Sequence, residues 1–140
     1  MKRVFTIPSD FAASRDVQIR IMQDVTDCNF DEESTFAIRI SLEEAIVNAI
    51  RHGNKLDPTK KVHVESDISP KRVEIVVEDE GKGFVRHAVP DPTHEENLAR
   101  PSGRGILLIE SYMSRVTWDH DGRRVHMVKD AADLAAPSKC

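Results

Sequence analysis

Three polar residues spaced four apart, Glu44, Asn48 and His52, mark the segment best suited to chemistry. In a helix this spacing places them in one line along a single edge. A carboxylate one turn before an amide can act as a base that takes a proton, beside an oxygen that holds a hard cation. The same spacing fits an ordinary solvated helix edge, and for this segment alone both interpretations remain open.

The segment that carries these residues has the periodicity of a helix from Phe36 onward. The apolar side of this helix is expected to consist of Phe36, Ile40, Val47 and Ile50. At about 100° per residue these four fall on one arc, and a glycine such as Gly53 commonly ends a helix.

Asp79 ends the clearest strand of the sequence, Arg72–Asp79. Three alternating apolar residues precede it in the same side-chain phase, so Asp79 is predicted to face the core. A buried carboxylate needs a donor, and Gly81 and Gly83 permit close approach by a flat or bulky group. A purine offers both a ring and an amino group. The alternative is a hairpin turn in which Asp79 caps a backbone amide.

A third candidate is Gly103-Arg104-Gly105, directly before an apolar helix that is predicted to end at Ser114. Free N–H groups and the positive dipole at a helix start attract anions. Arg104 can contact a phosphate with two hydrogen bonds, as can Arg100 if the loop closes. The preceding segment, residues 80–102, has little periodicity, which for its length usually indicates function. An ordinary loop-to-helix junction is the alternative.

The rest of the chain supplies a frame for these segments. A helix capped by Ser9 or Asp10 precedes the Glu44 helix. The other predicted strands are Arg3–Ile7, Lys61–Ile68, Arg115–Trp118 and Arg124–Val128. This order predicts one sheet with the helices on a single face, an α+β two-layer sandwich.

Length and composition restrict the classes of function. The 140 residues suit one domain, which we expect at 1–130, with residues 131–140 as a flexible tail. The formal charge of −4 argues against a general nucleic-acid binder. No apolar run approaches bilayer length and no signal peptide is evident, which favours a cytoplasmic protein without membrane partners.

Together, the E-x-x-x-N helix, the D-x-G-x-G strand end and the G-x-G helix start resemble a known ATP-binding domain. It is the histidine kinase-like (GHKL-type) ATPase domain of gyrase-type topoisomerases, mismatch-repair ATPases, heat-shock chaperones and sensor histidine kinases. Within that superfamily the sequence looks most like the stand-alone anti-sigma-factor serine/threonine kinases of bacterial partner-switching systems. The resemblance runs from about Phe5 to Lys129 and implies a mixed, mostly antiparallel sheet.

The resemblance implies roles for the residues of the Glu44 helix. Glu44 would be the general base, and Asn48 would hold Mg²⁺ bridging the phosphates of ATP. Arg51 stands where related domains often have a basic residue near the phosphates. Glu43 is a rival for the base, but helical geometry is expected to set it on the core side, which favours Glu44.

The resemblance also implies roles for the later segments. Asp79 would accept the amino group of adenine, and residues 84–102 would form a lid over ATP. The glycines expected to line the nucleotide are Gly81, Gly83, Gly103 and Gly105. The lid departs from the family pattern, which leaves open whether Arg100 or Arg104 meets the terminal phosphate.

The function implied is an ATP- and Mg²⁺-dependent protein serine/threonine kinase that phosphorylates an anti-anti-sigma (STAS-type) partner. The alternative is a non-catalytic, ATP-binding regulator that sequesters a sigma factor or another protein. The resemblance also allows a homodimer formed through the sheet.

Overall fold

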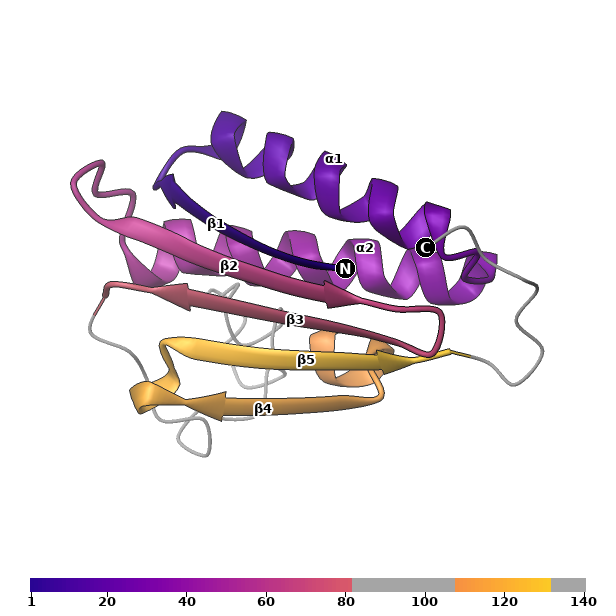
Figure 1. Ribbon diagram of the computed structural model, residues 1–140. Helices are drawn as coiled ribbons and strands as arrows, with labels where there is room; N and C mark the ends of the chain where they lie inside the picture. The colour runs from indigo at the N-terminus through magenta and orange to yellow at the C-terminus, as the bar shows by residue number, and fades with distance from the viewer. Residues whose placement is uncertain (82–107, 132–140) are drawn as a thin grey trace.

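The computed structural model describes residues 1–81 and 108–131. Within these residues one sheet forms in the order β1-β2-β3-β5-β4 (Figure 1). Its strands are β1 (Lys2–Pro8), β2 (Lys61–Ile68), β3 (Arg72–Asp79), β4 (Arg115–Asp119) and β5 (Arg124–Asp130). Each pair of neighbours is antiparallel. The predicted sheet is confirmed, and its described part is antiparallel throughout.

Two long helices, α1 (Phe11–Asp27) and α2 (Glu32–Asn48), lie side by side on one face of this sheet (Figure 1). Each begins at an aspartate whose side chain accepts a backbone N–H bond in the first turn. Asp10 caps α1 and Asp31 caps α2. A further helical stretch covers residues 108–112. The predicted two-layer α+β fold is confirmed.

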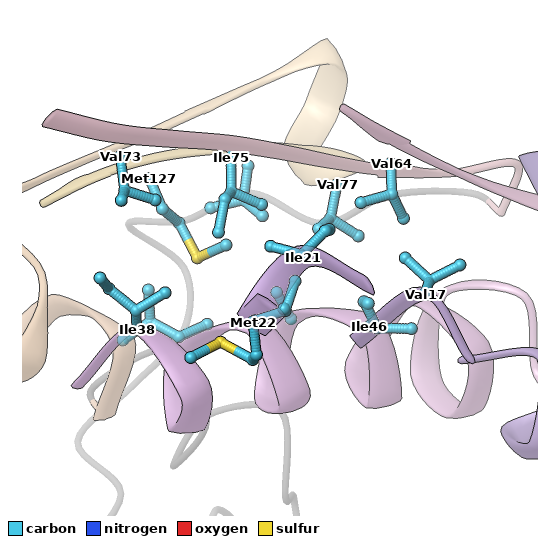
Figure 2. Close-up of a cluster of buried hydrophobic side chains, with 14 of the residues drawn as sticks. Val17, Ile21, Met22, Ile38, Ile46, Val64, Val73, Ile75, Val77 and Met127 are labelled. Atoms are coloured by element: carbon cyan, nitrogen blue, oxygen red, sulfur yellow. The ribbon is translucent and has the colours of Figure 1, made fainter. Parts of the chain in front are cut away.

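The apolar core fills the space between the sheet and these helices (Figure 2). Val64, Ile75 and Met127 point from three strands toward Ile21 of α1 and Ile38 of α2. All five side chains are completely buried. Burying one such side chain stabilises the fold by roughly 1.5–3 kcal/mol, so this packing holds α2 firmly against the sheet.

The buried face of this helix agrees with the predicted arc only at Ile50, which is completely buried. Phe36 is 49% exposed, and Ile40 and Val47 are only half-buried. Phe36 instead packs edge-to-face on Tyr112, with ring centroids 5.7 Å apart. Because α2 carries apolar residues on more than one side, its periodicity did not identify the face that meets the sheet. The buried apolar positions within α2 are Ala37, Ile38, Leu42, Ala45 and Ile46.

A turn wider than that of an α-helix follows the end of α2. The α-helix stops at Asn48 and continues as a π-helical turn, η1 (Ala49–Gly53). Single π-turns are rare and are found frequently at functional sites. In this protein the turn brings Gly53 beside the end of β3. Among the described residues, no helix has the length and apolar character that a membrane span requires.

Candidate functional site

Asp79 is the last residue of β3 and is 8% exposed, which confirms that it faces the interior. Its Oδ1 accepts a hydrogen bond of 2.8 Å from the amide of Gly81. Its own amide donates to the carbonyl of Arg123 at 3.0 Å. Burial raises the pKa of Asp79 from 3.8 to about 6, although the Gly81 hydrogen bond and the Arg123 charge act in the opposite direction. A carboxyl in these surroundings gains stability from a further donor.

Two glycines enclose this carboxyl. A β-carbon on Gly53 would lie 2.3 Å from both Cγ and Oδ2 of Asp79. A β-carbon on Gly81 would lie 1.9 Å from the carbonyl oxygen of Gly53. Atoms do not approach this closely without a bond, so any larger residue would push the end of η1 away from the end of β3. In the sequence, Gly53 indicates only the end of a helix, because termination alone explains a glycine there.

Glu44 and Glu43 of α2 differ in how far their side chains are exposed. Glu44 is half-buried, whereas Glu43 is exposed. The prediction that Glu43 faces the core is therefore wrong, because the buried face of the helix passes through Leu42 and Ala45 instead. Burial, and next the negative charge of Glu43, raise the pKa of Glu44. Of the two carboxylates, Glu44 has the environment expected of a base.

Asn48 and His52 follow Glu44 along the same helical edge. The Nδ2 atom of Asn48 and the Nε2 atom of His52 are buried and have no hydrogen-bond partner among the described residues. A half-turn of the Asn48 amide would place its oxygen where the nitrogen lies. Burial, followed by the charge of Arg51, lowers the pKa of His52 and favours its neutral form. This edge therefore carries polar atoms whose hydrogen-bonding capacity is unused within the described residues.

The polar edge of α2 suits a cation that is bound partly by the protein and partly by a ligand. Residues 1–81 and 108–131 contain no cluster of three or more His, Cys, Asp or Glu side chains that could hold a metal ion. Mg²⁺ is commonly bound by one or two protein oxygens together with the phosphates of a substrate. An amide oxygen at Asn48 fits that pattern, which requires no complete protein cage.

The π-turn joins the polar edge of α2 to the Asp79 pocket. Gly53, which would meet Asp79 with any added β-carbon, is the last residue of η1 and follows Asn48 by five residues. The structure thus brings the end of the E-x-x-x-N helix and the end of the D-x-G-x-G strand together. Their roles toward a nucleotide stay predictions.

Arg51 lies on the side of the site that faces α1. Its side chain is exposed, and its Cζ atom stands 5.4 Å from the ring centroid of Phe11, a cation–π arrangement. Its predicted contact with phosphates stays a prediction. The remaining predicted site residues lie outside the described residues, as does the proposed lid at 84–102. These residues are Gly83, Arg100, Gly103, Arg104 and Gly105.

Two further residues contact the turn at Asp79 and could not be identified from the sequence alone. The carbonyl oxygen of Arg123, in the turn between β4 and β5, accepts the hydrogen bond from the amide of Asp79. Asn54 follows η1 and is 1% exposed, and its side chain accepts a bond from the amide of Glu80 at 2.8 Å. Both positions have the sequence character of turns, which gives no signal for contacts across the fold.

Comparisons with known proteins identify the family of this chain. The profile of the histidine kinase-like ATPase domain family matches residues 8–129. The chain is 32% identical over 99 residues to the serine-protein kinase RsbW of Bacillus licheniformis, covering 66% of this chain and 62% of that protein. It is 33% identical over 98 residues to the anti-sigma F factor of Oceanobacillus iheyensis, covering 66% of each. Because the family match covers most of its length, the chain belongs to the histidine kinase-like ATPase domain family.

Proposed function

We propose that this protein is an ATP-dependent serine/threonine kinase and anti-sigma regulatory factor that phosphorylates an anti-anti-sigma (STAS-type) partner in the cytoplasm. Membership of an ATPase family implies ATP binding. The finer assignment is supported by relatives named as a serine-protein kinase and an anti-sigma factor. The observation that carries it is the buried Asp79 carboxyl, enclosed by Gly53 and Gly81 at the end of the helix that carries Glu44.

Asp79 would bind the adenine of ATP. Its carboxyl is buried and still has acceptor capacity beyond the Gly81 bond. The exocyclic amino group of adenine is a donor that would stabilise the ionised form, whereas guanine presents a carbonyl oxygen at the same ring position. Gly53 and Gly81 leave no side chain between this carboxyl and the end of η1.

Asn48 would hold Mg²⁺ together with the phosphates, because its buried amide has an unused polar group on the edge of α2. When bound, ATP would supply the terminal phosphoryl group and Mg²⁺ would neutralise the charge on the phosphates. Within the protein, the rigid packing of α2 against the sheet keeps the amide and the neighbouring carboxylate in fixed relative positions.

Glu44 would take the proton of the serine or threonine hydroxyl. The oxygen of that hydroxyl would bond to the terminal phosphorus of ATP as the bond to the leaving ADP breaks. A base is most effective when its pKa lies close to the working pH. Burial and the charge of Glu43 raise the pKa of Glu44, which moves it in that direction. Because Glu44 is only half-buried, a hydroxyl on a partner protein can reach it without entering the core.

A non-catalytic regulator is the second candidate. The observation that favours it is the relative named as an anti-sigma F factor, a name that mentions no kinase activity. Such a protein would bind ATP at Asp79 and sequester a sigma factor or another partner.

Phosphoryl transfer separates these candidates. The full chain is mixed with γ-labelled ATP, Mg²⁺ and the anti-anti-sigma-like protein encoded nearest to it. Label on a serine or threonine of the partner is the expected result. A protein that binds ATP and partner but transfers no label with any such candidate would be a regulator and not a kinase.

A further inference from the structure

Asn54 connects three separate segments of the chain through one side chain. Its Nδ2 donates to the hydroxyl of Ser9 at 3.0 Å and to the carbonyl of Lys61 at 2.9 Å. Its Oδ1 accepts from the amide of Glu80 at 2.8 Å. The side chain thereby links the segment after η1 to the β1–α1 junction, to the start of β2 and to the end of β3.

The orientation of this amide is fixed by its partners. The Lys61 carbonyl can only accept a hydrogen bond, and the Glu80 amide can only donate one. Reversing the Asn54 amide would set oxygen against oxygen and nitrogen against nitrogen. Because Asn54 is 1% exposed, water cannot readily replace these bonds, and losing one would leave a buried polar group unpaired.

The amide held by Asn54 belongs to the residue between Asp79 and Gly81. The Gly81 amide in turn donates to the Asp79 carboxyl, so the two hydrogen bonds fix successive amides of one turn. The backbone that carries Asn54 directly follows Gly53, which contacts that carboxyl. Asn54 therefore ties the two sides of the Asp79 pocket to each other.

A second tether to this turn is weaker. The Glu80 carboxylate accepts from the Lys61 amide at 2.7 Å and lies 3.2 Å from a nitrogen of His63. Both the Glu80 and His63 side chains are about 40% exposed, at 42% and 39%, so water competes for these contacts. The hydrogen bond to the buried Asn54 side chain is the one expected to decide where the turn lies.

We propose that Asn54 is a positioning residue that fixes the Asp79–Gly81 turn and thereby sets the preference of the pocket for adenine. The proposal rests on the function proposed above for Asp79. Asn54 touches no reacting atom. It determines whether the carboxyl stands where the amino group of adenine can reach it.

The test compares Asn54→Ala with Ser9→Ala. Ser9 shares the cluster, accepting from Asn54 and donating to the Lys60 carbonyl at 2.8 Å, but it makes no bond to the Glu80 amide. Both substitutions remove part-buried hydrogen bonds, and thermal unfolding reports the stability lost by each. Calorimetric titrations with ATP and GTP then give the nucleotide preference of each variant.

The expected result is a preference for ATP over GTP that falls about tenfold in Asn54→Ala and stays unchanged in Ser9→Ala. Amide hydrogen exchange adds a readout that needs no nucleotide. The Glu80 amide should be protected in the unmodified protein and should exchange about tenfold faster in Asn54→Ala, and Ser9→Ala should leave it protected.

A folded Asn54→Ala protein that keeps its ATP preference within about threefold would overturn the proposal. If that variant does not fold, the unmodified protein still decides the matter, because an unprotected Glu80 amide would show that Asn54 does not hold the turn. If the unmodified protein shows a protected Glu80 amide but no preference for ATP, the positioning stands and the proposed role of Asp79 fails.

Discussion

A β-carbon on Gly53 would stand 2.3 Å from the Cγ atom of Asp79, although the two residues lie on different elements. The end of the helical segment and the end of β3 can meet only because position 53 has no side chain. This contact places a buried acid with a raised pKa beside the helix that carries Glu44 and Asn48. The proposed nucleotide pocket depends on it.

Gly53→Ala should damage both the pocket and the fold. The added methyl group must displace either Asp79 or the backbone of η1, at a cost of about 1–3 kcal/mol. ATP affinity, measured by calorimetry, should fall about tenfold or more because Asp79 moves. Urea unfolding measures the loss of stability.

The matched control is Ile21→Val, a completely buried position on α1 that makes no part of the pocket. It should cost about 0.5–1.5 kcal/mol of stability and leave ATP affinity unchanged. Gly53→Ala protein that binds ATP as well as the unmodified chain would show that this contact does not shape the pocket.

Glu44→Gln should separate binding from catalysis. Glutamine keeps the size of the side chain but cannot take a proton, so the rate of phosphoryl transfer should fall about 100-fold or more. ATP affinity should change little. Glu43→Gln is the control, because Glu43 is exposed, and it should retain most of the activity. Equal loss of activity in both variants would argue against Glu44 as the specific base.

Asp79→Asn should reveal the energetic cost of the buried carboxyl. Because the folded pKa, about 6, lies above the ordinary value of 3.8, the unfolded chain ionises first as the pH rises. The stabilising contribution of the protonated acid is therefore present below about pH 4 and lost as the pH rises through about 6. Between pH 4 and pH 7 the free energy of unfolding of Asp79→Asn should therefore rise by up to about 3 kcal/mol relative to that of the unmodified protein.

Urea unfolding of both proteins at these two pH values measures that gain. A stability difference that is the same at pH 4 and pH 7 would mean that Asp79 titrates with an ordinary pKa in the folded protein.

The affinity for adenosine should increase with pH, whereas the stability of the folded protein decreases over the same range. The amino group of adenine donates to the ionised carboxyl, so binding should strengthen as the pH rises through the Asp79 pKa of about 6. Adenosine has no phosphate to titrate in this range. Its affinity, followed by NMR titration, should be about tenfold weaker at pH 5 than at pH 7.5. An affinity that does not change over this interval would exclude ionised Asp79 as the acceptor.

Much of the fold could be predicted from local patterns. Strict alternation gave both ends of β2 and β3, because each strand has one buried and one solvated face. The same alternation predicted the burial of Asp79. The buried face of α2 could not be predicted in this way, because Phe36 and other apolar residues lie outside the surface that meets the sheet. The prediction that Glu43 faces the core was wrong for the same reason.

The contacts that complete the site could not be predicted from the sequence. Gly53 and Asn54 both meet residues of the Asp79 turn, and the Asn54–Glu80 bond joins positions 26 residues apart. A Gly-Asn pair after a helix has the ordinary composition of a turn. Only the packing of α2 on the sheet, which follows from many buried side chains together, brings that turn to the end of β3.

Calorimetric titration of the unmodified protein and of Asp79→Asn with ATP tests the central claim most directly. We expect the unmodified protein to bind ATP with a Kd below about 1 mM, and Asp79→Asn to bind at least about tenfold more weakly. The unmodified protein should also bind ATP more tightly than GTP. No heat of binding at millimolar ATP, or equal affinity in the two proteins, would contradict Asp79 as the residue that recognises adenine.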